Sequence, residues 1–326
     1  MTFPRLKHIP DGLAMVVTDL HGTGDVFDTV IDTFHDLHAA GQVDRLVMCG
    51  DLIHGYGSAK DDASLRMINE VIDLQDELGA DTVIMLMGNH EMPHVYSITL
   101  SKGTLEFTGR FEHALSKSGH RDRVMRFLTD LPIYASTNAG VLITHAGATP
   151  AVTTPDEAEN ILTFDHDALL QLADDRIRNA SDLDALKSDK NYLRQAKHYL
   201  AISGIDDPRY THLLRGQILS HGEDQFEFLW DVLFSYNERG YTLSAYEIIL
   251  QHFLESISVH APTEQRVVVA GHISVQGGHN VVTKQQLRLA SYAHATPKSA
   301  GQILLLDCAK PVETASDLVP MLRPTL

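Results

Sequence analysis

The stretch LMGNHE, residues 86–91, follows directly on the apolar run VIM at residues 83–85. A short apolar run of this kind predicts a buried β-strand. A glycine ends the run, and an amide, an imidazole and a carboxylate then stand side by side at Asn89, His90 and Glu91. An ordinary turn does not need three such side chains. The sequence therefore predicts that one edge of a sheet presents ligand-type groups here.

Strands and helices alternate in the first half of the chain. Apolar runs predict strands at residues 13–18, 43–50 and 81–88. Apolar residues at helical spacing, each series ended by a glycine, predict helices at residues 26–40 and 64–78. Such alternation is typical of an α/β sheet covered by helices.

The second half of the chain changes character twice. Residues 131–147 predict a strand hairpin that turns near residues 138–140, and residues 155–258 are richly charged with helical periodicity. We interpret residues 155–258 as a helical insert or cap. Because no Pro/Gly-rich linker divides the chain, we predict that residues 1–326 form a single domain. Strands resume in four runs, which we expect to form a second antiparallel or mixed sheet: residues 266–271, 279–283, 286–291 and 301–307.

Composition excludes several classes of function. The 26 Lys and Arg against 43 Asp and Glu give a net charge of −17, which disfavours binding to nucleic acid. No apolar run approaches the roughly 20 residues that span a bilayer, so we expect no membrane partner. The start of the chain lacks the pattern of a signal peptide. The two cysteines make no disulfide framework, which favours a cytoplasmic location.

Polar side chains follow five predicted strands. The five motifs are TDLHG (residues 18–22), CGDLIHG (49–55), MGNHE (87–91), ITHAG (143–147) and VAGHIS (269–274). Each motif alone is more often a plain turn. Loops at the carboxyl ends of sheet strands are where α/β folds build their sites, so the five together favour a common site. Asp, His and Asn without cysteine suit manganese, iron or zinc, and a carboxylate such as Asp51 can bridge two cations for phosphoryl transfer.

The motif order resembles that of the calcineurin-like metallophosphoesterases, closest to the phosphoprotein phosphatase family. That family carries GDxHG, GDxVDRG, GNHE, HGG and GH, which the five motifs match in order. FLWD (residues 228–231) and the segment that begins NERG (237–240) also resemble family elements. The likeness covers most of residues 13–307, apart from much of 155–227. It implies a sandwich of two mixed sheets flanked by helices.

The resemblance also implies roles for individual residues. Asp51 would bridge two metal ions, Arg239 would bind the substrate phosphate, and His90 would donate a proton to the leaving group. The metal ions would be divalent or trivalent (Mn, Fe or Zn). The implied metal ligands are Asp19, His21, Asp51, Asn89, His145 and His272.

The chain departs from the family pattern beside the proton donor. Where the family has Val-Asp-Arg-Gly, this chain has Ile53-His54-Gly55. His54 therefore replaces the carboxylate partner of His90, and we expect the two imidazoles to lie side by side. The arginine of that motif is missing, as is the one that often precedes GNHE. Arg110 and Arg215 could substitute, although solvated or salt-bridged arginines are the default expectation.

Histidines outside the motifs are expected to be ordinary. We predict that His94 and His294 are surface residues near the rim of the site. His279, in GGHN, could support a metal ligand, but a turn residue is the stronger interpretation.

These observations predict a binuclear metallophosphatase that hydrolyses phosphate monoesters by attack of a metal-bridging hydroxide. The expected substrate is phosphoserine or phosphothreonine in a protein. The alternative is a small phosphorylated substrate, such as a dinucleoside polyphosphate or another phosphometabolite. A non-catalytic, metal-bound interaction module is a second alternative, and a nuclease is disfavoured by the acidic composition. The oligomeric state is left open.

Overall fold

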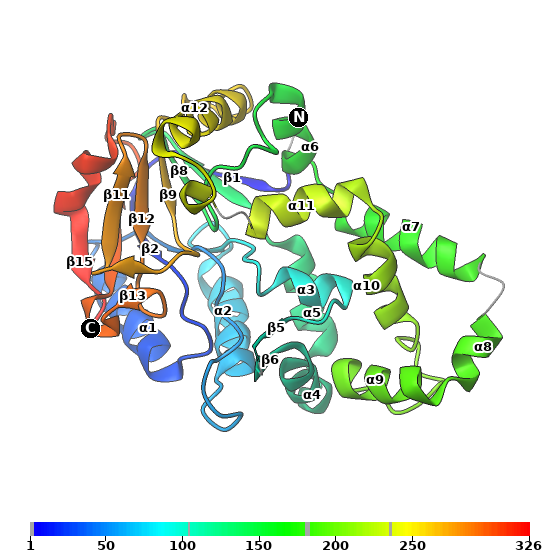
Figure 1. The fold of residues 1–326 in the computed structure, drawn as a ribbon. Coiled ribbons are helices and arrows are strands. Elements are labelled where there is room, and N and C mark those ends of the chain that lie inside the picture. The colour runs from blue at the N-terminus through cyan, green and yellow to red at the C-terminus, as the bar shows by residue number, and fades with distance from the viewer. Residues whose placement is uncertain (1–2, 104, 180–182, 235–236) are drawn as a thin grey trace.

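A pair of mixed β-sheets forms one side of the molecule (Figure 1). The structure, a computed structural model, describes residues 3–103, 105–179, 183–234 and 237–326. The five-stranded sheet has the order β15-β14-β2-β3-β4: Leu322–Pro324, Gln302–Asp307, Leu13–Val17, Arg45–Met48 and Val83–Met85. The six-stranded sheet has the order β1-β7-β8-β9-β12-β11: Leu6–Ile9, Tyr134–Thr137, Val141–Thr144, Val267–Ala270, Gln286–Leu289 and His279–Thr283.

The two sheets pack face to face through alternate residues of each strand. In β2, Ala14 and Val16 belong to the core between the sheets, whereas Met15 and Val17 belong to the core under the helices. Strands covered on both faces read as continuous apolar runs, which explains why these segments showed no polar alternation. The sandwich of two mixed sheets flanked by helices is confirmed.

Helices cover the outer faces of the sandwich (Figure 1). Leu74 of α2 and Phe34 of α1 pack in the same core as the outward residues of β2. Tyr134 of β7 meets Phe253 of α12 with ring centroids 5.8 Å apart. The flanking helices are α1 (Gly24–Ala39), α2 (Ser64–Leu78), α6 (Pro155–Leu162) and α12 (Leu243–Ser258).

The remaining helices extend to one side of the sandwich (Figure 1). They are α3 (Met92–Tyr96), α4 (Thr108–Ser118), α5 (Arg121–Asp130), α7 (His166–Arg178), α8 (Leu183–Ser188), α9 (Lys190–Leu200), α10 (His212–Ser220) and α11 (Asp224–Phe234). Tyr192, Leu200 and Tyr210 belong to a small separate core in this region. Residues 155–258 are thus largely helical where they are described, and the assignment of the chain to one domain stays a prediction.

Short elements complete the chain. They are the strands β5 (Ser101–Lys102), β6 (Leu105–Glu106), β10 (Val275–Gln276) and β13 (Ala295–Thr296), and the 3-10 helices η1 (Asn237–Arg239), η2 (Lys298–Ala300) and η3 (Ala315–Met321). No helix within the described ranges is both long and apolar enough to cross a membrane.

One strand lies in a different sheet from the predicted one. We expected residues 301–307 to pair with the other late strands, but β14 pairs antiparallel with β2 in the five-stranded sheet. Both faces of β14 are covered, so its apolar run carries no mark of the sheet to which it belongs. Strand β1, which pairs in parallel with β7, was not predicted at all.

Candidate metal centre

The carboxyl ends of five strands bring the predicted ligands together. Strands β2, β3 and β4 are parallel in one sheet, and β8 and β9 are parallel in the other. Their ends therefore meet at one edge of the sandwich. The backbone N–H of His272 donates to both carboxylate oxygens of Asp19, at 3.1 and 3.0 Å, and so joins the two sheets at this edge.

Three side chains form the first ligand cluster. His145 Nε2 lies 2.8 Å from Asn89 Oδ1 and 3.1 Å from His272 Nδ1, and Asn89 Oδ1 lies 2.9 Å from His272 Nδ1. His145 Nδ1 is 2.8 Å from the carbonyl oxygen of Cys49, to which it donates. The Nε2 atom of His145 therefore carries a lone pair that faces the carbonyl lone pairs of Asn89. A cation between these atoms would satisfy both.

A second cluster lies beside the first. His21 Nδ1 faces the carbonyl oxygen of Ile53 at 3.3 Å, and the buried Nε2 of His21 has no hydrogen-bond partner among the residues that the structure describes. Asp19 Oδ1 lies 3.4 Å from His294 Nδ1, for which the described part of the chain likewise supplies no hydrogen-bond partner. His294 lies at the site, as predicted, but it is less exposed than a surface residue. Its side chain is 12% exposed and could hold a metal ion together with Asp19 and His21.

Asp51 lies between the two clusters. One of its carboxylate oxygens is 3.5 Å from His145 Nε2, and the other is 3.5 Å from His21 Nε2. Burial, together with the charges of Glu91 and Asp19, raises the pKa of Asp51 well above its usual range. Buried carboxylates of this density are costly unless cations compensate them. The residues therefore fit two metal ions, one on each side of Asp51.

The loops that carry these side chains adopt unusual backbone conformations. Asp19, His21, Asp51, His54 and His272 all have positive φ angles, between 42° and 71°. Such conformations cost roughly 1–3 kcal/mol each and cluster at functional sites. Asp and His tolerate them better than most residues, so the ligand types also suit the backbone.

The backbone contacts of Glu91 explain why GNHE ends in a carboxylate. One of its carboxylate oxygens accepts from the backbone N–H groups of Asp51 and Gly88, at 2.9 and 3.1 Å. The other accepts from Leu52 and Ile53, at 3.0 and 3.3 Å. Burial raises the pKa of Glu91 to about 7, although these four hydrogen bonds favour the carboxylate. Glu91 therefore fixes the loop that presents Asp51.

Two glycines allow the loops to approach so closely. A Cβ atom at Gly88 would lie 2.4 Å from the backbone nitrogen of Asp51, and one at Gly271 would lie 2.1 Å from Asp19 Oδ2. Both distances are shorter than real Cβ contacts, so a larger residue at either position would displace a predicted ligand.

Comparison with known proteins agrees with this geometry. The sequence pattern of the calcineurin-like phosphoesterases matches residues 14–294. The chain belongs to this family. As a calcineurin-like phosphoesterase, it is a metal-dependent hydrolase that uses two metal ions and acts on phosphorylated substrates.

Similar solved structures are found at low sequence identity. A protein serine/threonine phosphatase from Saccharomyces cerevisiae, described as similar to human phosphatase PP5, is 13% identical over 94% of this chain and 77% of its own, with a TM-score of 0.51. A cold-active protein-tyrosine phosphatase of a psychrophilic Shewanella species is 17% identical over 95% of this chain and 79% of its own, with a TM-score of 0.44. No curated protein matches the chain.

A pocket of about 480 Å³ opens above both clusters of this phosphoesterase. Asp51, Asn89, His90 and His272 contribute to its floor, and Arg239 of η1 lines it. Lys102 also lines the pocket and lies 5.3 Å from the ring centroid of Tyr56. No sequence motif marks Lys102, because it belongs to a two-residue strand, β5, outside all five motifs.

Arg110 and Arg215 do not take part in this pocket. Arg110 donates to the carbonyl oxygens of Gly55 and Gly57, at 3.0 Å each, and Arg215 pairs with Asp174 at 3.4 Å. The default expectation for both arginines is confirmed. A third arginine, Arg288, is fully buried and was missed.

Arg288 supports the loops of two predicted ligands. It donates to the carbonyl oxygens of Ala146 and Gly271, at 2.8 Å each, next to His145 and His272 in the chain. Glu238 neutralises it through hydrogen bonds of 2.7 and 2.9 Å. The apolar strand pattern of residues 286–291 gave no indication that an arginine inside it would be buried at the site.

The histidines around His90 form a buried group. His54 Nδ1 lies 2.9 Å from His90 Nδ1, so the expected contact between these imidazoles is present. The prediction that His94 is a surface residue is wrong: it is 1% exposed, because α3 turns it under the site, and its Nε2 lies 2.7 Å from His54 Nε2. Burial and the neighbouring His54 hold the pKa of His90 well below its usual value. His279 lies elsewhere, at the start of β11, where it bonds Gln302 at 2.7 Å.

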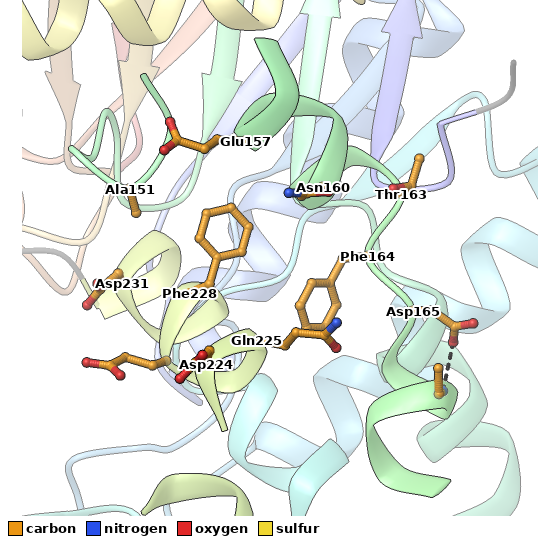
Figure 2. A pocket seen from close by; sticks show the side chains of 12 residues that line it. Ala151, Glu157, Asn160, Thr163, Phe164, Asp165, Asp224, Gln225, Phe228 and Asp231 are labelled. Carbon is orange, nitrogen blue, oxygen red and sulfur yellow. Dashed lines mark hydrogen bonds between the residues drawn. The ribbon is translucent and has the colours of Figure 1, made fainter. Parts of the chain in front are cut away.

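A larger pocket, of about 680 Å³, shares no lining residue with the pocket above the metal clusters (Figure 2). Helices α6 and α11 and the start of α7 line it, with Phe164 and Phe228 among its side chains (Figure 2). Its ionisable lining residues are all acidic: Glu157, Asp165, Asp224, Glu227 and Asp231. A phosphate dianion would meet only like charge there, so this pocket is not the phosphoester site.

Proposed function

We propose that this phosphoesterase hydrolyses phosphate monoesters, with phosphoserine or phosphothreonine in a protein as its substrate. One observation carries the proposal: a single pocket combines Asp51, the proton-donor candidate His90 and the cations Arg239 and Lys102. A doubly charged phosphate would lie between the two metal ions that the ligand clusters would hold and these two cationic side chains. The yeast structural neighbour, a protein serine/threonine phosphatase, supports the choice of substrate.

The proposed roles follow from the positions of the side chains. Asp19, His21 and Asp51 would hold one metal ion, and Asp51, Asn89, His145 and His272 the other. When bound, the metal ions supply a water of lowered pKa and Lewis-acid polarisation of the phosphoryl group. Manganese, iron or zinc suits these nitrogen and oxygen donors. A cytoplasmic location and the absence of nucleic-acid partners stay predictions from composition.

Arg239 and His90 would act on opposite ends of the substrate. The guanidinium of Arg239 would bind the non-bridging phosphate oxygens through charge-assisted hydrogen bonds. His90 Nε2 lies 4.0 Å from Asp51 Oδ2 and its side chain is 10% exposed, toward the pocket. From there it would protonate the leaving oxygen.

A second candidate substrate is a dinucleoside polyphosphate or another small phosphometabolite. The aromatic side chains of Tyr56, Phe107 and Phe234 line the same pocket. Such side chains can stack on a nucleobase. Turnover of a phosphoserine peptide compared with that of diadenosine tetraphosphate, both with added manganese, decides between the two substrates. If p-nitrophenyl phosphate also fails to release phosphate, the chain is a metal-bound interaction module instead.

Replacing Arg239 with alanine should lower kcat/KM without releasing metal. The expected loss is about 10²- to 10³-fold, the usual effect of removing one group that stabilises transition-state charge. Steady-state kinetics with a phosphoserine peptide, together with metal analysis by mass spectrometry, measures both quantities. Arg176→Ala, at an exposed arginine of α7 that pairs with Glu223 and does not line the pocket, is the matched control. Unchanged kcat/KM in Arg239→Ala would transfer the role to Lys102 or to no residue at all.

The pH profile of kcat should depend on His54. His90 must be protonated to act as an acid, and burial with a neighbouring imidazole lowers its pKa. The alkaline limb of the profile should therefore lie at a lower pH than an ordinary imidazole would give. In His54→Asp a carboxylate would favour the imidazolium of His90, so the limb should move to higher pH. An unshifted limb, with both metals still bound, would show that residue 54 does not govern this proton.

A further inference from the structure

A continuous chain of hydrogen bonds leads from His90 to a buried carboxylate on α4. His90 Nδ1 meets His54 Nδ1 at 2.9 Å, His54 Nε2 meets His94 Nε2 at 2.7 Å, and His94 Nδ1 meets Glu112 Oε1 at 2.9 Å. Arg121 donates to the other oxygen of Glu112. The side chains of His94 and Glu112 are 0% and 3% exposed, so water does not compete for these contacts.

Aromatic rings hold the middle of this chain in place. The ring of His54 stacks on Phe107, with centroids 5.2 Å apart and planes at 13°. His94 packs against Phe111, with centroids 4.6 Å apart. The backbone N–H of His54 donates to Ser64 Oγ at 2.8 Å. The rings therefore cannot turn to find other partners without breaking the surrounding packing.

The carboxylate sets the direction of every hydrogen bond in the chain. An ionised carboxylate only accepts, so His94 carries its proton on Nδ1 and its Nε2 must accept. His54 then donates from Nε2 and accepts at Nδ1. His90 consequently donates from Nδ1, which leaves its Nε2 free to face the pocket. Hydrogen bonds to one ring nitrogen determine which nitrogen of a histidine carries the proton.

We propose that Glu112 is a positioning residue that fixes the tautomer of His90 through His54 and His94. This relay, the chain of hydrogen bonds from Glu112 through His94 and His54 to His90, replaces the carboxylate neighbour that the sequence lacks at position 54. This inference rests on the proposed function of His90 as proton donor. As the phosphorus–oxygen bond breaks, His90 passes its Nε2 proton to the leaving oxygen and keeps its Nδ1 proton in the hydrogen bond to His54. The product is an alcohol and a neutral His90 in the tautomer that the relay favours.

Replacement of Glu112 with glutamine should reverse the relay. The carbonyl oxygen of the glutamine would stay with Arg121, which can only donate, and its NH₂ group would donate to His94 Nδ1. Each histidine would then shift its proton to its other nitrogen. His54 would present an N–H to His90 Nδ1, and this contact would oppose the doubly protonated form of His90 that the acid step requires.

The leaving group provides a test that a general loss of structure would not imitate. With a phosphoserine peptide, whose alkoxide needs a proton, kcat of Glu112→Gln should fall about 10²-fold or more. With p-nitrophenyl phosphate, whose phenolate leaves without a proton, it should fall less than about threefold, because the acid contributes little there. Equal losses with both substrates, or no loss with either, would overturn the relay.

A control and a rescue sharpen this experiment. Glu106, the last residue of β6, also faces a histidine, His198, at 3.8 Å, but it does not touch the relay. Glu106→Gln should change both rates by no more than about twofold. In His54→Asp the carboxylate oxygen would stand where Nδ1 stands now, so His90 would no longer depend on Glu112. A remaining 10²-fold loss when Glu112→Gln is added to His54→Asp would contradict the inference.

Nuclear magnetic resonance reads the tautomer directly. In zinc-loaded protein with ¹⁵N-labelled histidine, His90 should be protonated at Nδ1 in the parent and at Nε2 in Glu112→Gln. The same tautomer in both proteins would refute the relay, whatever the kinetics. If Glu112→Gln does not fold, His94→Phe interrupts the relay and leaves the contact between Glu112 and Arg121 in place. It should show a selective loss with the peptide, and unchanged rates would refute the relay.

His90→Asn separates this inference from the proposed function. A selective loss with the peptide in His90→Asn but not in Glu112→Gln would overturn the relay alone. Equal losses with both substrates in His90→Asn would overturn the acid role of His90, and the tautomer measurement would still decide whether Glu112 orders the three histidines.

Discussion

Replacing Asp51 with asparagine should abolish most of the activity of this phosphoesterase and release at least one metal ion. The asparagine keeps an oxygen for the backbone N–H of His90, which donates to Asp51 Oδ1 at 2.9 Å, but it removes the charge shared by the two clusters. Metal ions contribute several kcal/mol of transition-state stabilisation. Since each 1.36 kcal/mol is a factor of ten, a loss of about 10³-fold in kcat is expected. Mass spectrometry of the native protein measures the metal content.

A matched variant tests whether the effect belongs to this site. Asp231 lines the acidic pocket of Figure 2 and not the pocket above the clusters, and Asp231→Asn removes the same charge from the protein. It should keep two metal equivalents and the parental rate. Two tightly held equivalents with full activity in Asp51→Asn would show that Asp51 is not the bridging ligand.

The strands that carry the site could be predicted because each is a clear apolar run and because strands that follow one another in the sequence are also neighbours in the sheet. Strands β2, β3 and β4 are parallel neighbours in chain order, so residues that follow them reach the same edge of the sheet. Asp19, Asp51 and Asn89 could therefore be placed together from the sequence. Their motifs also require glycines and left-handed residues, which makes them distinct from ordinary turns.

The residues that escaped prediction lie where burial depends on tertiary contacts. His94 belongs to a five-residue helix, too short to show a periodic apolar face, and its burial involves contacts with Phe111 and Glu112 of α4. His294 reaches Asp19 from a loop after β12 that no motif marks. Arg288 interrupts an apolar strand, where its charge is neutralised by Glu238, about 50 residues away in the sequence. No local pattern encodes partners at such separations.

Replacing His90 with asparagine should slow the hydrolysis of alkyl phosphates by about 10²- to 10⁴-fold, the usual contribution of a general acid. The asparagine side chain reaches as far as Nδ1 of the imidazole, so the contact with His54 can persist while the Nε2 atom that faces the pocket is lost. Asp51 should keep its hydrogen bond from the backbone N–H of residue 90, and metal content should stay at two equivalents.

The dependence on the leaving group distinguishes this loss from damage to the metal centre. A departing alkoxide needs a proton, whereas p-nitrophenolate does not, so His90→Asn should retain most of its rate on p-nitrophenyl phosphate. Asp51→Asn should lose both activities together, because both substrates need the metal ions. The ratio of the two rates in each variant is therefore the decisive measurement. A ratio in His90→Asn equal to that of the parent would mean that the leaving oxygen takes its proton from another group or from water.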